Sequence, residues 1–178
     1  MLLNPIANEI FKNIQIIHEN QMPYTHRKLL SQHKYMTVVL EKYVNSHLKL
    51  NVIDQVIFNN ILSRAIVLTT NNSKPVLFAG IDIYLNALST HLRELVKESK
   101  IPLGALLNRS GIKESFANKD YFSIVANQSL AGHLECEKNL QHFGRINYIY
   151  DNKENFIAKS VEVLAQQLTP FTARITGL

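Results

Sequence analysis

Residues 61–85 read ILSRAIVLTT, NNSKP and VLFAGIDIYL, two apolar runs on either side of a short polar segment. Both runs are rich in β-branched residues, and the segment between them has the composition of a turn. This stretch therefore predicts a β-hairpin. Residues 145–150 and 156–164 flank DNKEN at 151–155 and predict a second hairpin, while residues 48–58 and 121–126 each predict a further strand.

Apolar residues at helical spacing surround these strands. Isoleucines recur every three to four positions from Ile6 to Ile17, which predicts an N-terminal amphipathic helix. The same spacing predicts helices at 35–43, 88–96 and 133–142. Hairpins and separate helices together predict one α+β domain over residues 1–178, with an antiparallel sheet and its helices on one face.

Composition narrows the class of protein. The chain has 178 residues, of which 46% are hydrophobic and 19% charged, as expected for a globular protein. Its single cysteine, Cys136, suits a cytoplasmic protein. No apolar run reaches the length of a membrane span, and nothing in the sequence sets the oligomeric state, for which a monomer is favoured.

The net charge of +5 favours an anionic partner. The basic residues are scattered and form no cluster that could follow a phosphate backbone, so we expect a small molecule and no nucleic acid. The seven histidines lack the spacing of a zinc helix, and no phosphate-binding or dinucleotide-binding glycine motif is present. We therefore expect no metal and no cofactor.

Two charged residues interrupt apolar strands. Arg64 lies within ILSRAIVL, and an arginine is almost never fully buried unless it is paired. It either reaches the solvent or faces a cavity and holds an anion. Glu162 lies within SVEVL, where strand alternation puts it on the same face as Ser160. It either faces solvent or lines a pocket as an acceptor or general base.

Five segments, read in order, resemble the chorismate pyruvate-lyase family. They cover roughly residues 29 to 165, and it is their order and spacing, more than any single motif, that carries the resemblance. The segments are LLSQHKYMTVVLEKYVNSHLKLNVIDQ from Leu29, ILSRAIVLT from Ile61, KPVLFAGIDI from Lys74, KIPLGALL from Lys100 and HFGRINYIYDNKENFIAKSVEVL from His142.

The resemblance implies an antiparallel sheet of about six strands with helices packed on one side and a substrate held beneath helical flaps. It also implies a lyase that splits chorismate into 4-hydroxybenzoate and pyruvate without a cofactor, supplying a ubiquinone precursor. Arg64 would bind the ring carboxylate, and Glu162 would meet the ring hydroxyl. Met36 and the backbone at Leu103 would close over the ligand.

The sequence departs from the family pattern at three places. Ile81 stands where an arginine is expected after Ala-Gly, and an ungapped reading of the last hairpin puts Ser160, not Glu162, at the carboxylate position. Residues 105–143 form a longer segment than the family pattern has. These departures leave open an alternative, a non-catalytic module of the same fold that binds a small aromatic carboxylate.

Overall fold

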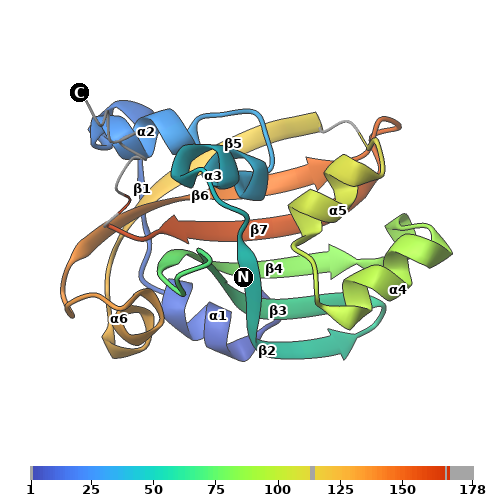
Figure 1. Cartoon of the computed structure of the whole chain (residues 1–178), viewed down its shortest axis with the longest axis horizontal. Helices are drawn as coiled ribbons and strands as arrows, with labels where there is room; N and C mark the ends of the chain where they lie inside the picture. The colour runs from blue at the N-terminus through green and yellow to red at the C-terminus, as the bar shows by residue number, and fades with distance from the viewer. Residues whose placement is uncertain (1, 113–114, 167, 169–178) are drawn as a thin grey trace, which may run out of the picture.

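The sheet is the centre of the molecule. The computed structural model describes residues 2–112, 115–166 and 168. Seven antiparallel strands form one sheet in the order β1-β5-β6-β7-β4-β3-β2 (Figure 1). Their bounds are β1 (Gln15–Ile17), β2 (Lys49–Phe58), β3 (Ile61–Thr69), β4 (Pro75–Tyr84), β5 (Ser115–Val125), β6 (Gln141–Tyr150) and β7 (Phe156–Leu164).

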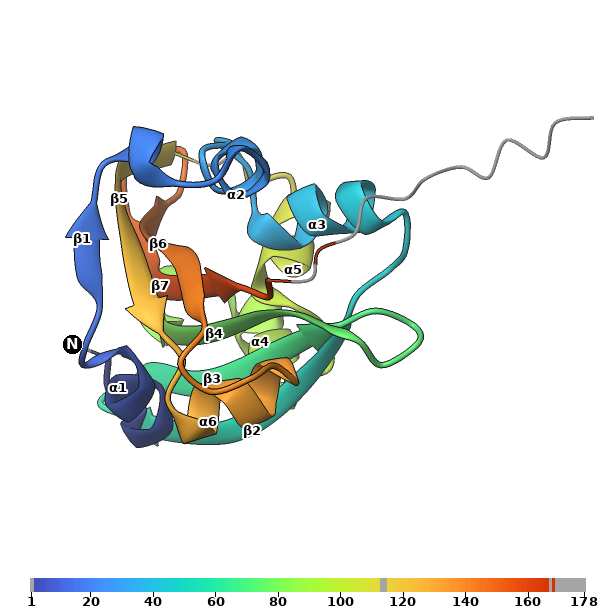
Figure 2. The same ribbon diagram turned by 90° about the vertical axis from the view of Figure 1, so that its left-hand side faces the viewer.

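Helices cover both faces of this sheet. The α-helices are α1 (Pro5–Phe11), α2 (Tyr24–Leu30), α3 (Met36–Val44), α4 (Thr90–Glu98), α5 (Leu103–Arg109) and α6 (Gln128–Leu134), and the 3-10 helices are η1 (Glu19–Gln21) and η2 (Leu85–Ala87). Helices α2, α3, α4 and α5 lie on one face, whereas α1 and α6 lie on the other (Figure 2). The sequence predicted helices on one face only, so the second layer, formed by α1 and α6, corrects that expectation.

Each face of the sheet has its own apolar core. The larger core lies under α2 to α5 and includes Leu30, Leu40 and Leu107. The smaller one lies under α1 and α6 and includes Phe78 and Phe122. Because both faces of β3 and β4 are buried, these strands read as continuous apolar runs and not as an alternation. No helix among the described residues has both the length and the hydropathy to cross a membrane.

The expected N-terminal helix is shorter than its isoleucine repeat. The Asn4 side chain caps the backbone N–H of Ala7, and α1 ends at Phe11. Residues 15–17 instead form β1, in which Ile16 pairs with Phe122 of β5. Ile16 and Ile17 thus belong to an edge strand, because pairing with a strand that is distant in the sequence outweighs a local helical spacing.

The expected helix at 133–142 is also displaced. The Asn127 side chain caps α6 at the N–H of Leu130, and Glu135 ends the helix in the left-handed region with φ 51°. His142 lies on β6 and pairs with Ile124 of β5. Within the described residues, the long segment 105–143 therefore supplies one whole strand, β5, and α6, one of the two helices that cover the second face.

A glycine brings α1 close to the sheet. A Cβ atom on Gly80 of β4 would lie 2.3 Å from the Leu2 side chain and 2.6 Å from that of Ala7. Any larger residue at this position would push α1 away from the smaller core. In the Ala-Gly pair that supported the resemblance, Gly80 thus has a packing role on the face opposite to α3 and α5, whereas Ala79 faces those helices.

Candidate ligand-binding site

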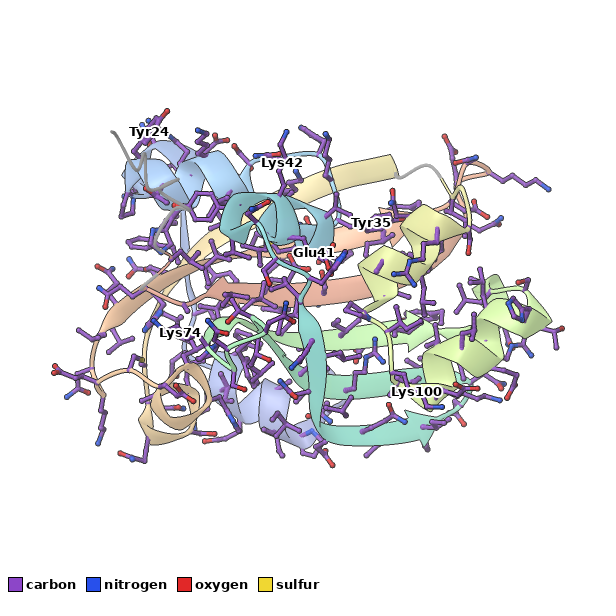
Figure 3. The ribbon with its side chains drawn as sticks, viewed as in Figure 1. Tyr24, Tyr35, Glu41, Lys42, Lys74 and Lys100 are labelled. Atoms are coloured by element: carbon purple, nitrogen blue, oxygen red, sulfur yellow. The ribbon has the colours of Figure 1, made fainter. Side chains whose placement is uncertain are left out.

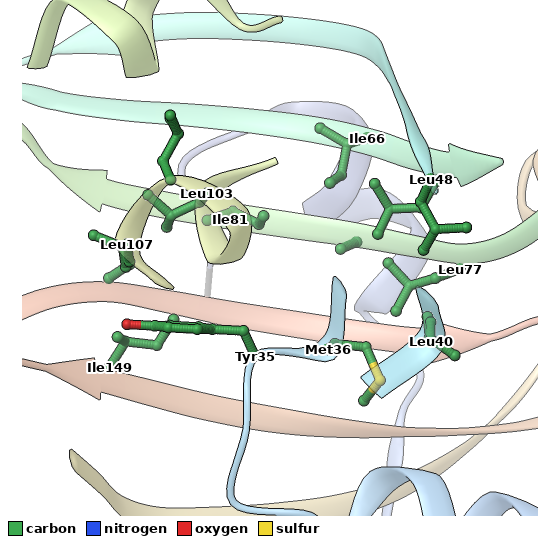
Figure 4. Close-up of a cluster of buried hydrophobic side chains, with 14 of the residues drawn as sticks. Tyr35, Met36, Leu40, Leu48, Ile66, Leu77, Ile81, Leu103, Leu107 and Ile149 are labelled. Atoms are coloured by element: carbon green, nitrogen blue, oxygen red, sulfur yellow. The ribbon is translucent and has the colours of Figure 1, made fainter. Parts of the chain in front are cut away.

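A small cavity lies between the sheet and the start of two helices. Its volume is about 40 Å³. Its roof, residues 35–37 and 102–104, consists of Tyr35, Met36, Thr37, Pro102, Leu103 and Gly104, and its floor is formed by side chains of β3, β4, β6 and β7. Figure 4 shows Tyr35, Met36 and Leu103 over the strands that carry Ile81, Leu77 and Ile149. Most of the lining is apolar, and the polar groups gather on β6 and β7.

The two helices of the roof begin against each other. Tyr35 precedes α3 and Pro102 precedes α5, and neither residue caps its helix with a side-chain hydrogen bond. A Cβ atom on Gly104 would lie 2.7 Å from the Cβ atom of Tyr35 and 3.4 Å from Oγ1 of Thr37. The Pro-Leu-Gly sequence therefore permits α5 to start in contact with α3, which closes the cavity from above.

Arg145 and Glu162 form a buried ion pair in the floor. They are cross-strand neighbours on β6 and β7, and Nε of Arg145 lies 2.7 Å from Oε2 of Glu162. The two side chains are 1% and 11% exposed, so water screens the pair very little. Removing either partner would leave the other as an uncompensated buried charge.

Asn147 and Ser160 extend this polar cluster. They too are cross-strand neighbours, and the Ser160 hydroxyl donates to Oε1 of Glu162 at 3.2 Å. One amide atom of Asn147 lies 2.7 Å from Nε and 3.0 Å from Nη2 of Arg145. We assign it as the carbonyl oxygen, because both neighbours are donors. Oε1 of Glu162 accepts one hydrogen bond within the described residues, from Ser160, and remains able to accept a second.

Arg64 lies beside the cavity but does not line it. Its backbone pairs with Ile81, and Ile66 follows two residues later on the same face of β3. Both isoleucines line the cavity. The Arg64 side chain is 0% exposed, and its Nη1 donates to Oγ of Ser99 at 3.2 Å. Ser99, which ends α4, donates in turn to Oε1 of Gln55.

The charge of Arg64 is unbalanced. Its Nε and Nη2 have no hydrogen-bond partner within the part of the chain that the structure describes. Burial lowers the pKa of the guanidinium from 12.5 to about 10, so the group stays charged at neutral pH. A buried cation with two idle donors is costly and is a ready partner for an anion.

The predicted site residues fall into two groups. Met36, Leu103 and Glu162 meet around one cavity, and Ser160 lines it as well. Ser160 and Glu162, the two candidates for the carboxylate position, are hydrogen-bonded to each other there. Arg64 lies next to this group on the same face of the sheet. Ile81, where an arginine was expected, lies between Arg64 and Ser160 across three neighbouring strands.

Sequence reasoning missed Arg145 and Asn147 as site residues. Arg145 follows Gly144 in HFGRINYI and is 0% exposed, as Arg64 is. The signal that identified Arg64, a cation inside an apolar strand, was therefore present at Arg145 also. Strand register then puts Arg145 beside Glu162, a fact that depends on the pairing of β6 with β7.

Two other buried groups lie outside the cavity lining. His26 on α2 packs against Phe143 with ring centroids 5.4 Å apart, and both its ring nitrogens lack a partner among the described residues. His142 bonds through Nδ1 to the Leu164 carbonyl at 3.0 Å and approaches Sγ of Cys136 at 3.4 Å. Burial lowers the pKa of both histidines.

Comparison with known proteins supports the fold. No family model matches the chain, and no curated protein matches it by sequence. Among solved structures, it is similar to the effector domain of PhnF from Mycobacterium smegmatis, with a TM-score of 0.61, 13% identity, and coverage of 77% of this chain and 91% of that one. The fold is the chorismate lyase-like α+β fold found in the C-terminal domains of GntR-family regulators.

Two further structures have the same arrangement. A GntR-family transcriptional regulator from Enterococcus faecalis gives a TM-score of 0.53 and 14% identity, over 69% of this chain and 97% of that one. YydK from Bacillus subtilis, described as a possible transcriptional regulator, gives a TM-score of 0.55 and 11% identity over 74% of this chain. The match spans 63% of the length of YydK, so this chain corresponds to part of that regulator.

These neighbours overturn one expectation. The prediction that the chain is a chorismate lyase is wrong, because the proteins that share its fold are named as transcriptional regulators. Glu162, expected as the catalytic carboxylate, accepts hydrogen bonds from Arg145 and Ser160. The expected products and the ubiquinone pathway have no support and are dropped with the lyase.

Proposed function

We propose that this chain is a non-catalytic effector-binding domain that takes a small aromatic carboxylate between the sheet and the helices α3 and α5. The observation that carries this proposal is Arg64, a fully buried guanidinium with two unpartnered donors beside the cavity. Folding leaves this charge without a counter-ion within the described residues, and an incoming carboxylate would supply one.

The far end of the cavity supports a ligand with a hydroxyl group. Ser160 and Glu162 present acceptor oxygens there, and Glu162 is held in place by Arg145. Arg64 and Ser160 belong to strands β3 and β7, two strand spacings or about 10 Å apart at the backbone. The interval between them is apolar and centred on Ile81, which suits one aromatic ring.

The cavity must enlarge before such a ligand can enter. Its volume is about 40 Å³, whereas an engineered protein cavity that binds benzene measures roughly 150 Å³. The roof is formed by the first residues of α3 and α5, which touch each other at Gly104 and Tyr35. Separation of these helix starts would open the path from Ile81 towards Arg64. Ligand binding would thus be coupled to a movement of two helices, as a regulatory domain requires.

Titration calorimetry with 4-hydroxybenzoate tests the proposal. We expect binding to the wild-type protein, about tenfold weaker binding of benzoate because one hydrogen bond is lost, and none of phenol, which lacks the carboxylate. Arg64→Gln should abolish binding, while Arg109→Gln, the same change at an exposed arginine, should leave it intact. Unchanged binding to Arg64→Gln would refute the proposed anchor.

A parallel assay tests for catalysis. Chorismate is incubated with the protein, and pyruvate is followed with a coupled dehydrogenase. We expect pyruvate to be released no faster than in buffer alone.

The regulatory role is proposed because the chain is similar to the effector domain of PhnF and to part of YydK. Its ligand-bound state would then be detected by another part of such a protein.

A further inference from the structure

The connector between α2 and α3, residues 31–35, is fastened to the sheet through its backbone carbonyls. Nη1 of Arg145 donates to the carbonyls of Leu30 and Gln32 at 3.1 Å each, and Nη2 donates to that of Lys34 at 3.2 Å. Charge-assisted hydrogen bonds of this kind are about twice as strong as neutral ones. The connector thus depends on one buried guanidinium from β6.

A second cation holds the same connector. Nζ of Lys119 on β5 donates to the carbonyl of Ser31 at 3.2 Å and to that of Gln32 at 2.5 Å. Lys119 pairs with Asn147 across the strands, one row from Arg145. These contacts involve the backbone of the connector, so its fastening depends little on its own side chains.

Arg145 also faces the cavity. Its Nε holds Glu162 at 2.7 Å, while its two terminal nitrogens hold the connector. The guanidinium is planar and its five donors have fixed directions. Glu162, by holding Nε, therefore sets the direction in which the two terminal nitrogens point, and loss of this contact weakens the bonds to the connector.

The connector leads directly into the roof. Residue 35, at its end, together with Met36 and Thr37 covers the cavity, and α2 lies before it in the sequence. A displacement of the connector would therefore move the roof and α2 together. Figure 1 shows α2 and α3 side by side at the same edge of the helical layer, and they contact each other.

We infer that Arg145 is a positioning residue that transmits a change at Glu162 to the α2–α3 connector. A ligand donor bound to Glu162 weakens the attraction between Glu162 and Arg145, and a ligand acid in the cavity draws the guanidinium towards itself. Either change weakens the hydrogen bonds from Arg145 to the carbonyls of the connector. The inference rests on the proposed function for the identity of the ligand, but the link itself exists in the ligand-free protein.

Hydrogen exchange of the backbone amides in residues 31–37 tests the link without a ligand. Lys119→Gln removes a cation that binds the connector carbonyls, and we expect exchange there to rise about tenfold. Glu162→Gln cuts only the cavity side, and we expect a rise of at least threefold, although Glu162 bonds to Arg145 and Ser160 and not to the connector. Glu98→Gln, the same change at an exposed position on α4, is the matched control and should change nothing.

The outcomes separate the inference from the proposed function. Wild-type exchange in the connector of Glu162→Gln, with raised exchange in Lys119→Gln, would overturn the inference. If Glu162→Gln does not fold, Glu162→Asp, which withdraws the carboxylate by one methylene, should raise exchange at least twofold, and no rise would overturn the inference equally.

A second arm uses 4-hydroxybenzoate on the wild-type protein and on Arg145→Lys. We expect the ligand to change connector exchange at least threefold in the wild type. Arg145→Lys, which keeps the charge but lacks the planar fork, should bind the ligand and lose this response. If calorimetry detects no binding to the wild-type protein, the proposed function is refuted and the ligand-free comparison decides the link. If the wild-type protein binds the ligand and exchange in its connector does not change, the inference is overturned.

Discussion

Arg64 and Arg145 are both fully buried on the same face of one sheet, but among the described residues only Arg145 has a carboxylate partner. Arg145 is balanced by Glu162 at 2.7 Å, whereas Arg64 donates to the hydroxyl of Ser99 at 3.2 Å. The charge of Arg145 is therefore balanced within the ligand-free protein, which indicates a structural role. The charge of Arg64 has no counter-ion among the described residues, which indicates a binding role.

Replacement of Arg64 by methionine should stabilise the protein. The substitution removes an uncompensated buried charge and keeps a flexible apolar side chain of similar length. We expect the free energy of unfolding to rise by about 1 kcal/mol or more, since such charges are costly to bury. Urea denaturation measures the change, and a loss of stability would show that Arg64 has a partner that the structure does not reveal.

Replacement of Arg145 by methionine should have the opposite sign. It leaves Glu162 buried without its cation and frees the carbonyls of the connector. Breaking a buried pair in this way costs about 3–5 kcal/mol. The same urea titration, run beside Arg64→Met, gives the comparison. Equal effects of the two substitutions would contradict the distinction between the two arginines.

His26 should make the protein less stable in mild acid. Burial, followed by the neighbouring charge of His142, lowers the pKa of His26 in the folded state below the 6.5 of the unfolded chain. Below about pH 6.5 the unfolded state therefore binds more protons than the folded state. The free energy of unfolding has its full value above this pH and falls as the pH drops below it. Unfolding curves between pH 8 and pH 5 measure this loss.

His26→Leu provides the control for that pH dependence. It keeps an apolar contact with Phe143 and removes the titrating ring. We expect the variant to lose less stability than the wild type between pH 7 and pH 5. A smaller slope should persist, because burial also lowers the pKa of His142. An unchanged slope in His26→Leu would assign the whole effect to other groups.

Gly104→Ala should separate the two helices of the roof. The added Cβ atom would lie 2.7 Å from that of Tyr35, closer than two such atoms can approach. Overpacking of this kind costs about 1–3 kcal/mol. Gly132→Ala on α6 is the matched control, because none of the described residues would lie within 4 Å of the added Cβ atom and a helix favours alanine over glycine. Thermal unfolding should show a lower midpoint for the first variant only.

Several of the side chains labelled in Figure 3 lie on the surface. Labelled residues such as Lys42, Lys74 and Lys100 project from the outside of the molecule. Surface ion pairs, for example Lys100 with Glu98 at 3.3 Å, contribute little to stability because water screens them. The testable effects are therefore concentrated at the buried charges and at the contact of α3 with α5.

The sequence by itself determined the local features of this protein. The hairpins around residues 71–75 and 151–155 follow from turn composition between β-branched runs, and both are present as β3–β4 and β6–β7. Arg64 was also visible in the sequence, because a cation inside an apolar strand stands out from its neighbours. These properties depend on neighbours within about ten residues.

Only the tertiary structure decided which charges are balanced and which face each helix covers. Glu162 meets Arg145 through the pairing of β6 and β7, and Arg145 reaches the connector more than 100 residues earlier in the chain. Residues 15–17 became an edge strand because β5 pairs with them. Such contacts join segments that are distant in the sequence, and their free energy depends on burial and register, which no local pattern encodes.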